Sequence, residues 1–206
     1  MGFDRENSAL NFIFTIAFLI VVATAGFFVI DPVDMMNAKK DEKLSTEAST
    51  ILKAIYAYFD NKGVLPWANI TGSKLTSPPL SWTQANQEKV GICANDKCTK
   101  GSYLTEDYYV IVPGDPETQR KTYLPDGYLD NFVKEKIGED LYVGKGSSTQ
   151  SQTYVCFIPS SKKLRKSTGQ LYKLSPGASV SNLGPESCDD SVTWKEDDAC
   201  WKCVSK

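Results

Sequence analysis

The chain has 206 residues, of which 23 are Lys or Arg and 25 are Asp or Glu, so its net charge is −2, and it contains no histidine. The absence of imidazole excludes catalytic triads that use histidine, His-ligated zinc hydrolases and most general-base schemes at neutral pH. Basic and acidic residues are mixed along the sequence, which leaves no basic stripe for nucleic acid, so we expect neither an enzyme nor a nucleic-acid-binding protein.

The first predicted element is an uncharged stretch at residues 10–30, which follows a leader segment at residues 1–9. At about 1.5 Å per residue, a helix of this length spans roughly 30 Å, the thickness of the hydrocarbon core of a bilayer. The leader is not basic and no small-residue cleavage site follows the stretch, in contrast to a secretory signal peptide. A buried helix of a soluble domain would carry a wider polar face than Asn11, Thr15 and Thr24 provide. We therefore expect a retained transmembrane helix.

A second, amphipathic helix is predicted for residues 31–62. Its apolar residues recur at helical spacing and are expected to pack on the head domain: Leu44, Ala48, Ile51, Leu52, Ile55 and Phe59. Its charged residues are expected to keep the other face in solvent: Lys39, Lys40, Asp41, Glu42, Lys43, Glu47 and Lys53.

Proline and glycine mark the boundaries of this second helix. Pro32 lacks a backbone donor and should kink or locally melt the chain at the junction of the two helices. Gly63 can take the left-handed conformation that ends a helix, and Pro66 is expected to prevent the helix from resuming.

Residues 63–206 are predicted to form a β-rich head domain. Residues 107–112 and 153–158 are dense in β-branched and aromatic residues and are predicted strands, and residues 140–143 and 170–174 are weaker candidates. A short helix is predicted at residues 128–137. The glycine-rich run 144–148 lacks the spacing of a P-loop and is expected to be a surface turn. The chain as a whole is thus predicted to be α+β.

All cysteines lie in the head domain: Cys93, Cys98, Cys156, Cys188, Cys200 and Cys203. An even number in a membrane-tethered domain indicates up to three disulfides and an oxidising compartment. The alternative is a four-thiolate zinc site formed by Cys93, Cys98, Cys200 and Cys203 in a reducing cytosol. We expect Cys156 to join a strand to a loop and the segment 188–203 to be tied back to the head. Cys93 and Cys98 then either pair together or each hold part of that segment.

Two signals disagree on the orientation of the head domain. Lys39, Lys40 and Lys43 follow the apolar stretch, and a positive-inside count would place the head in the cytoplasm. These lysines continue a helix, however, whereas the rule applies to loops. We give the cysteines more weight and expect the head outside the membrane.

Residues 31–66 carry the pattern of a known family. An Asp31-Pro32 step is followed by charged and Ala positions, then by Ile51-Leu52-Lys53-Ala54-Ile55 and an Asp60-Asn61-Lys62-Gly63 end before Pro66. Over about residues 10–66 the chain resembles type IV pilins and pseudopilins. The resemblance implies a long N-terminal helix whose second half packs on an antiparallel sheet. It also implies an assembly helix that includes Leu10, Asn11, Phe14, Phe18, Val21 and Pro32.

Acidic residues near the end of the chain are candidate calcium ligands: Asp189, Asp190, Asp197 and Asp198. Pseudopilins often bind calcium in this part of the head, but no EF-hand spacing is present, and a solvated acidic loop is the favoured interpretation. No other cofactor is expected. Four tryptophans, Trp67, Trp82, Trp194 and Trp201, could form a surface on which a glycan stacks, although core or interface positions are the more usual ones.

Two functions follow as hypotheses. The first is a structural subunit of a type IV pilus-like or pseudopilus-like filament, with copies of itself, related pilins, the inner membrane and the assembly machinery as partners. Such a subunit would be membrane-anchored before assembly and part of a cell-surface filament afterwards. The second is a membrane-anchored extracellular adhesin or sensor domain that does not polymerise.

Overall fold

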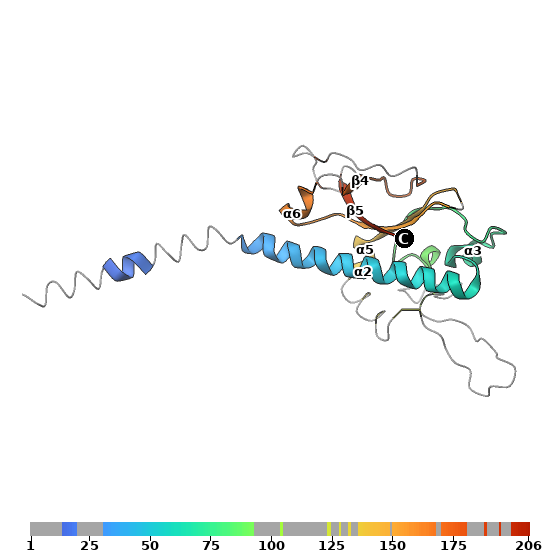
Figure 1. Cartoon of the computed structure of the whole chain (residues 1–206), viewed down its shortest axis with the longest axis horizontal. Coiled ribbons are helices and arrows are strands. Elements are labelled where there is room, and N and C mark those ends of the chain that lie inside the picture. Colours follow the sequence, from blue (N-terminus) through green and yellow to red (C-terminus); the bar gives the residue numbers. More distant parts are fainter. Residues whose placement is uncertain are drawn as a thin grey trace, which may run out of the picture.

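The computed structural model describes residues 14–19, 31–92, 104, 123, 124, 128, 132, 136–148, 150–167, 170–180, 188, 194 and 199–206. These residues form an α+β domain with one antiparallel five-stranded sheet, which confirms the predicted fold class (Figure 1). The strand order is β1-β2-β3-β5-β4, with bounds Leu80–Gln84, Tyr142–Lys145, Thr153–Phe157, Leu171–Lys173 and Cys200–Ser205 for β1 to β5. The helices are α2 (Pro32–Lys62), α3 (Pro66–Thr71), η1 (Glu88–Val90), α5 (Ile137–Asp140) and α6 (Lys162–Arg165).

Capping residues set both ends of helix α2. Asp31 is the N-cap: its backbone is extended, and its carboxylate accepts a hydrogen bond from the amide of Asp34 at 3.1 Å. Pro32 takes the first helical position, where a missing N–H costs nothing. Helix α2 therefore begins directly after Asp31, and the predicted kink or melting at its junction with the apolar stretch falls next to residues 20–30, which lie outside the described residues. At the other end Gly63 has φ 70° and donates its N–H to the carbonyl of Phe59, as predicted for the stop.

The two faces of the sheet carry separate apolar clusters. Side chains of α2 pack with Val143, Val155 and Phe157 on one face, and α2 runs along that face in Figure 1. The opposite face holds Trp82, Tyr142, Cys156, Leu174, Ala199 and Trp201. Because side chains alternate along a strand, neighbouring residues of β2 and β3 divide between the two clusters.

Several predicted elements differ from those observed. The strand at 153–158 is β3 and that at 170–174 is β4, whereas the strand expected at 140–143 begins only at Tyr142 because α5 occupies the residues before it. The predicted strand 107–112 lies outside the described residues. The prediction for Pro66 was wrong: this proline starts α3, since the first position of a helix needs no N–H.

The glycine-rich run is not a surface turn at its start. Gly144 and Lys145 belong to β2, in which every residue is buried. A Cβ on Gly144 would lie 2.5 Å from an atom of the Trp82 ring, so only glycine fits this close approach.

Four of the six cysteines form two disulfides, which confirms the predicted presence of disulfide bonds. Cys156 and Cys203 are directly paired residues of β3 and β5, and Cys188 bonds to Cys200. The expectation that Cys156 joins the sheet to a loop was wrong, because both partners lie in neighbouring strands. Cys200 and Cys203 are both in disulfides, so two of the four thiolates of the alternative zinc site are absent. Cys93 and Cys98 lie outside the described residues.

The apolar stretch 10–30 falls largely outside the described residues. Of it the structure describes residues 14–19, which are helical. Within the described part of the chain, no helix combines the length and the apolar character that crossing a bilayer requires.

Candidate functional site

The described residues expose large apolar side chains mainly near the N-terminal end. Eight are exposed, and seven of them lie in residues 14–19 or in the first turns of α2: Phe14, Ile16, Phe18, Leu19, Val33, Met35 and Met36. The first turns of α2 extend beyond the sheet in Figure 1, and Met36 is 74% exposed there. Contiguous exposed apolar side chains on one element are typical of interaction surfaces. We call Val33, Met35 and Met36 the stem patch.

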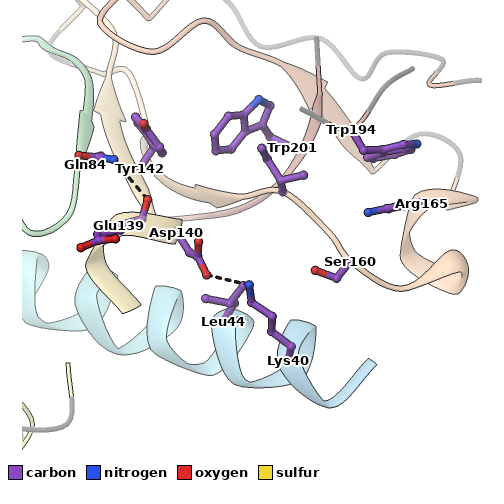
Figure 2. A pocket seen from close by; sticks show the side chains of 11 residues that line it. Lys40, Leu44, Gln84, Glu139, Asp140, Tyr142, Ser160, Arg165, Trp194 and Trp201 are labelled. Carbon is purple, nitrogen blue, oxygen red and sulfur yellow. Dashed lines mark hydrogen bonds and ion pairs between the residues drawn. The ribbon is translucent and has the colours of Figure 1, made fainter. Parts of the chain in front are cut away.

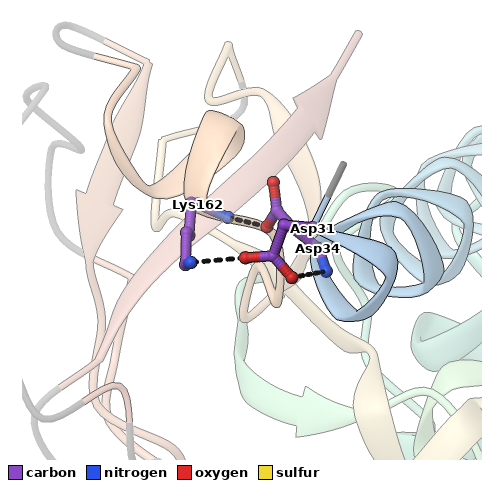
Figure 3. A network of polar contacts seen from close by, with 3 residues as sticks. All are labelled: Asp31, Asp34 and Lys162. Carbon is purple, nitrogen blue, oxygen red and sulfur yellow. Dashed lines mark hydrogen bonds and ion pairs between the residues drawn. The ribbon is translucent and has the colours of Figure 1, made fainter. Parts of the chain in front are cut away.

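Aspartates of α2 fix the stem patch relative to the head. The Asp31 carboxylate forms an ion pair with Lys162 Nζ at 2.6 Å, and Asp34 Oδ1 accepts the backbone N–H of Lys162 at 2.7 Å (Figure 3). The hydrogen bond from Lys162 is the largest of the effects that lower the pKa of Asp31, and the same bond raises the pKa of Lys162. Both partners are exposed to solvent, so this pair positions the chain more than it stabilises it.

Asp41 also joins α2 to the start of α6, through buried hydrogen bonds. Its side chain is fully buried, and its two carboxylate oxygens accept the backbone N–H groups of Ser160 at 2.7 Å and Ser161 at 2.8 Å. With Asp34 it satisfies three consecutive N–H groups at the start of α6, which a short helix cannot satisfy internally. We call Asp31, Asp34 and Asp41 together with residues 160–162 the aspartate latch.

A cavity of about 440 Å³ lies beside the latch (Figure 2). Lys40 from α2 and Asp140 from α5 form an ion pair of 2.9 Å across it. Arg165 lies 4.8 Å from the centre of the Trp194 ring, a cation–π contact on the other side, and Trp194 has φ 55°. The ring of Trp201 is buried and lines the cavity, and none of the residues that the structure describes accepts a hydrogen bond from its Nε1. The mixture of charged, amide and aromatic groups suits the binding of a polar molecule.

The residues predicted to pack the stem on the head lie together on α2. Leu44, Ile51, Leu52 and Ile55 are buried in the cluster with the sheet, and Phe59 is half-buried against it. Asp41 was predicted to face solvent, and this prediction was wrong, because the residue lies three positions before Leu44 and therefore on the same helix face.

The other predicted site residues are only partly described. Phe14 and Phe18 are exposed, and Pro32 starts α2. The remaining assembly-helix residues and the candidate calcium ligands lie outside the described part: Leu10, Asn11, Val21, Asp189, Asp190, Asp197 and Asp198. Of the four tryptophans, Trp67, Trp82 and Trp201 are buried and Trp194 is half-buried. The four rings therefore do not form one exposed surface on which a glycan could stack.

Sequence reasoning missed the latch. Asp41 at a core position of the apolar stripe was the available signal, because a carboxylate there must find buried donors. Its partners lie about 120 residues away, and nothing in their own sequence marks them.

Comparison with known proteins identifies no relative of this chain: no protein-family model, no curated protein and no solved structure matches it.

Proposed function

We propose that the chain is a structural subunit of a pilin-like filament, anchored in the membrane before assembly and located at the cell surface afterwards. The observation that carries the proposal is the stem patch, an exposed apolar end of a 31-residue helix that the latch holds in a fixed direction. The uncharged stretch 10–30 would continue this apolar surface toward the N-terminus.

Assembly in this proposal moves one apolar surface between two environments. The helix of the monomer is buried in lipid, and the helices of stacked subunits bury one another in the filament core. Both states remove apolar area from water, so the transfer needs no catalytic group. The partners are copies of the same chain, related pilins, the inner membrane and the assembly machinery.

Electron microscopy of material sheared from cells that express the chain tests this function. Wild-type cells should yield filaments, and Met36→Glu should abolish them because a charge would enter the subunit contact. Lys53→Glu, an exposed position on the same helix, is the matched control and should assemble normally. Equal melting temperatures of the two variants would show that the loss is one of assembly. A wild-type chain that is exported but never polymerises would overturn the proposal.

A second candidate function is a membrane-anchored binding module that does not polymerise. The cavity of about 440 Å³ between α2, α5 and α6 favours it, since assembly does not require such a cavity. Cells without filaments whose head domain binds a polar ligand, with the binding lost in Asp140→Asn, would support this alternative.

A further inference from the structure

A second cavity, of about 250 Å³, lies at the other end of α2 from the latch. It is lined by the C-terminal part of α2, the residues that follow it, the turn between β2 and β3, and the end of the chain after β5. Tyr56, Phe59 and Leu65 give it an apolar wall, while Lys145 and Thr153 come from the sheet. The volume is below the range of about 300–1,000 Å³ that is typical of sites for drug-sized ligands, so any ligand is small.

Lys145 is a buried cation, and the described part of the chain offers it no anionic partner. Its side chain is 3% exposed, and its Nζ donates to the carbonyls of Ser148 at 2.9 Å and Gly146 at 3.5 Å. No carboxylate of the described residues forms an ion pair with it. Burial lowers the pKa of Lys145. An ammonium group has three donors, and carbonyls take two of them.

Thr153 places an unsatisfied hydroxyl beside this ammonium group. The two residues are directly opposite each other in the β2–β3 register, so their side chains are neighbours on one face of the sheet. That face is the one toward α2, because Val143 and Val155, two positions away, pack in the α2 cluster. Thr153 is 1% exposed, and among the described residues its Oγ1 has no hydrogen-bond partner. A buried hydroxyl without a partner is costly unless a ligand satisfies it.

The charge of the lining selects the sign of the ligand. Lys145 and Lys206 both line the cavity, and no Asp or Glu side chain is among the described residues that line it. Lys206 is held in place by its own contacts, since its Nζ lies 5.0 Å from the centre of the Tyr56 ring and its carbonyl accepts the Tyr56 hydroxyl. The ammonium group of Lys145, a hydroxyl without a partner among the described residues and an apolar wall describe a site for an anion that has an apolar body.

We propose that this cavity binds a small organic carboxylate. The carboxylate oxygens accept hydrogen bonds from Lys145 Nζ and Thr153 Oγ1, and the apolar body lies against Phe59 and Leu65. This inference does not rest on the filament function, because the cavity and the stem patch are at opposite ends of α2.

Isothermal titration calorimetry of the full chain in non-ionic detergent, with benzoate as the probe, tests the site. Saturable binding is expected, and Lys145→Met should weaken it about tenfold or more, because a charge-assisted hydrogen bond is lost. Thr153→Val, which removes only the hydroxyl, should weaken binding severalfold. Lys53→Met removes a lysine charge from an exposed position of α2 and should leave binding unchanged.

Three results would overturn the proposal. Benzoate could fail to bind, which would limit Lys145 to holding the β2–β3 turn through the Ser148 carbonyl. Lys145→Met could bind benzoate as the wild type does. Inorganic phosphate could bind more tightly than benzoate, which would show that the apolar wall plays no part. If Lys145→Met does not fold, two other measurements test the site. Thr153→Val should weaken benzoate binding, and benzoate should shift the amide resonances of Lys145 and Thr153 in the wild type.

Discussion

At the scale of single residues, Asp41 is the group whose loss should matter most for the position of α6. Both of its oxygens are engaged in a buried site. Asn has nearly the same shape, but only its oxygen can accept, and its NH2 group would face one of the two N–H groups. We expect Asp41→Asn to lower the free energy of unfolding by about 1–3 kcal/mol, the cost of a buried donor left unsatisfied.

Urea denaturation of Asp41→Asn beside Glu42→Gln measures this effect. Glu42 is the next residue and is exposed, so its variant loses the same charge without losing buried hydrogen bonds. Equal denaturation midpoints for the two variants would contradict the structural role of the Asp41 carboxylate.

The exposed part of the latch should respond to pH. The pKa of Asp31 is lowered from its ordinary value of 3.8, so its contribution to stability is complete above pH 3.8 and is lost as pH falls through the lower value of the folded state. The pKa of Lys162 is raised from 10.5, so its contribution is complete below pH 10.5 and is lost only at a pH above the raised value. The ion pair therefore contributes throughout the neutral range.

Thermal melts of the wild type and Asp31→Asn at low salt test this window. The wild type should melt at the higher temperature at pH 7, and the difference should shrink at a pH well below 3.8 and in high salt, which screens exposed charges. Asp60→Asn, an exposed carboxylate near the opposite end of α2, should show no such dependence. A difference that persists unchanged in acid would show that the Asp31–Lys162 pair is not its cause.

At the scale of elements, the packing of α2 on the sheet should dominate the stability of the head. Ile55 is completely buried in the cluster that α2 forms with the sheet. Ile55→Ala should lower the free energy of unfolding by about 2–5 kcal/mol through lost burial and the cavity that remains. Lys53→Ala, on the exposed face of the same helix, should change it little, and a shared melting temperature for the two variants would contradict this packing.

The elements that could be predicted from the sequence are those with local signals. Helix α2 has a 3.6-residue apolar repeat, a capping aspartate and a terminal glycine, so its extent followed directly. Strand β3 has a dense run of β-branched and aromatic residues. Strand β1 was missed because its pairing partner β2 is about 60 residues away along the chain. Strand β5 was missed because its partners β3 and β4 are about 50 and about 30 residues away, and because its two cysteines indicated disulfides or metal rather than a strand.

The sites were less predictable than the elements, for the same reason. The aspartate latch joins residues 119 to 131 positions apart, and the Lys145–Thr153 pair depends on the register of β2 with β3. Lys145 lies between Gly144 and Gly146, so its local sequence predicts a turn although the residue belongs to a strand. Only the packing of the sheet against α2 shows that it is buried.

At the scale of the whole molecule, the disulfides hold strand β5 in place between β3 and β4. The Cys156–Cys203 bond closes a loop of 47 residues and joins β5 to β3, whereas the Cys188–Cys200 bond closes only 12. A disulfide typically contributes about 2–4 kcal/mol, and more for the longer loop, chiefly by restricting the unfolded chain. Since these four cysteines are paired with one another, Cys93 and Cys98 have only each other as partners within the chain.

The oxidation state of the six cysteines tests in which compartment the head domain functions. A head exported to an oxidising compartment should contain three disulfides. Mass spectrometry of native protein alkylated without reduction should then show no labelled cysteine and a mass six hydrogens below that of the reduced chain, from the six cysteines present. Labelling confined to Cys93 and Cys98 would contradict the third disulfide. Labelling of all six would place the head in a reducing compartment, and the proposal of a cell-surface filament would fail with it.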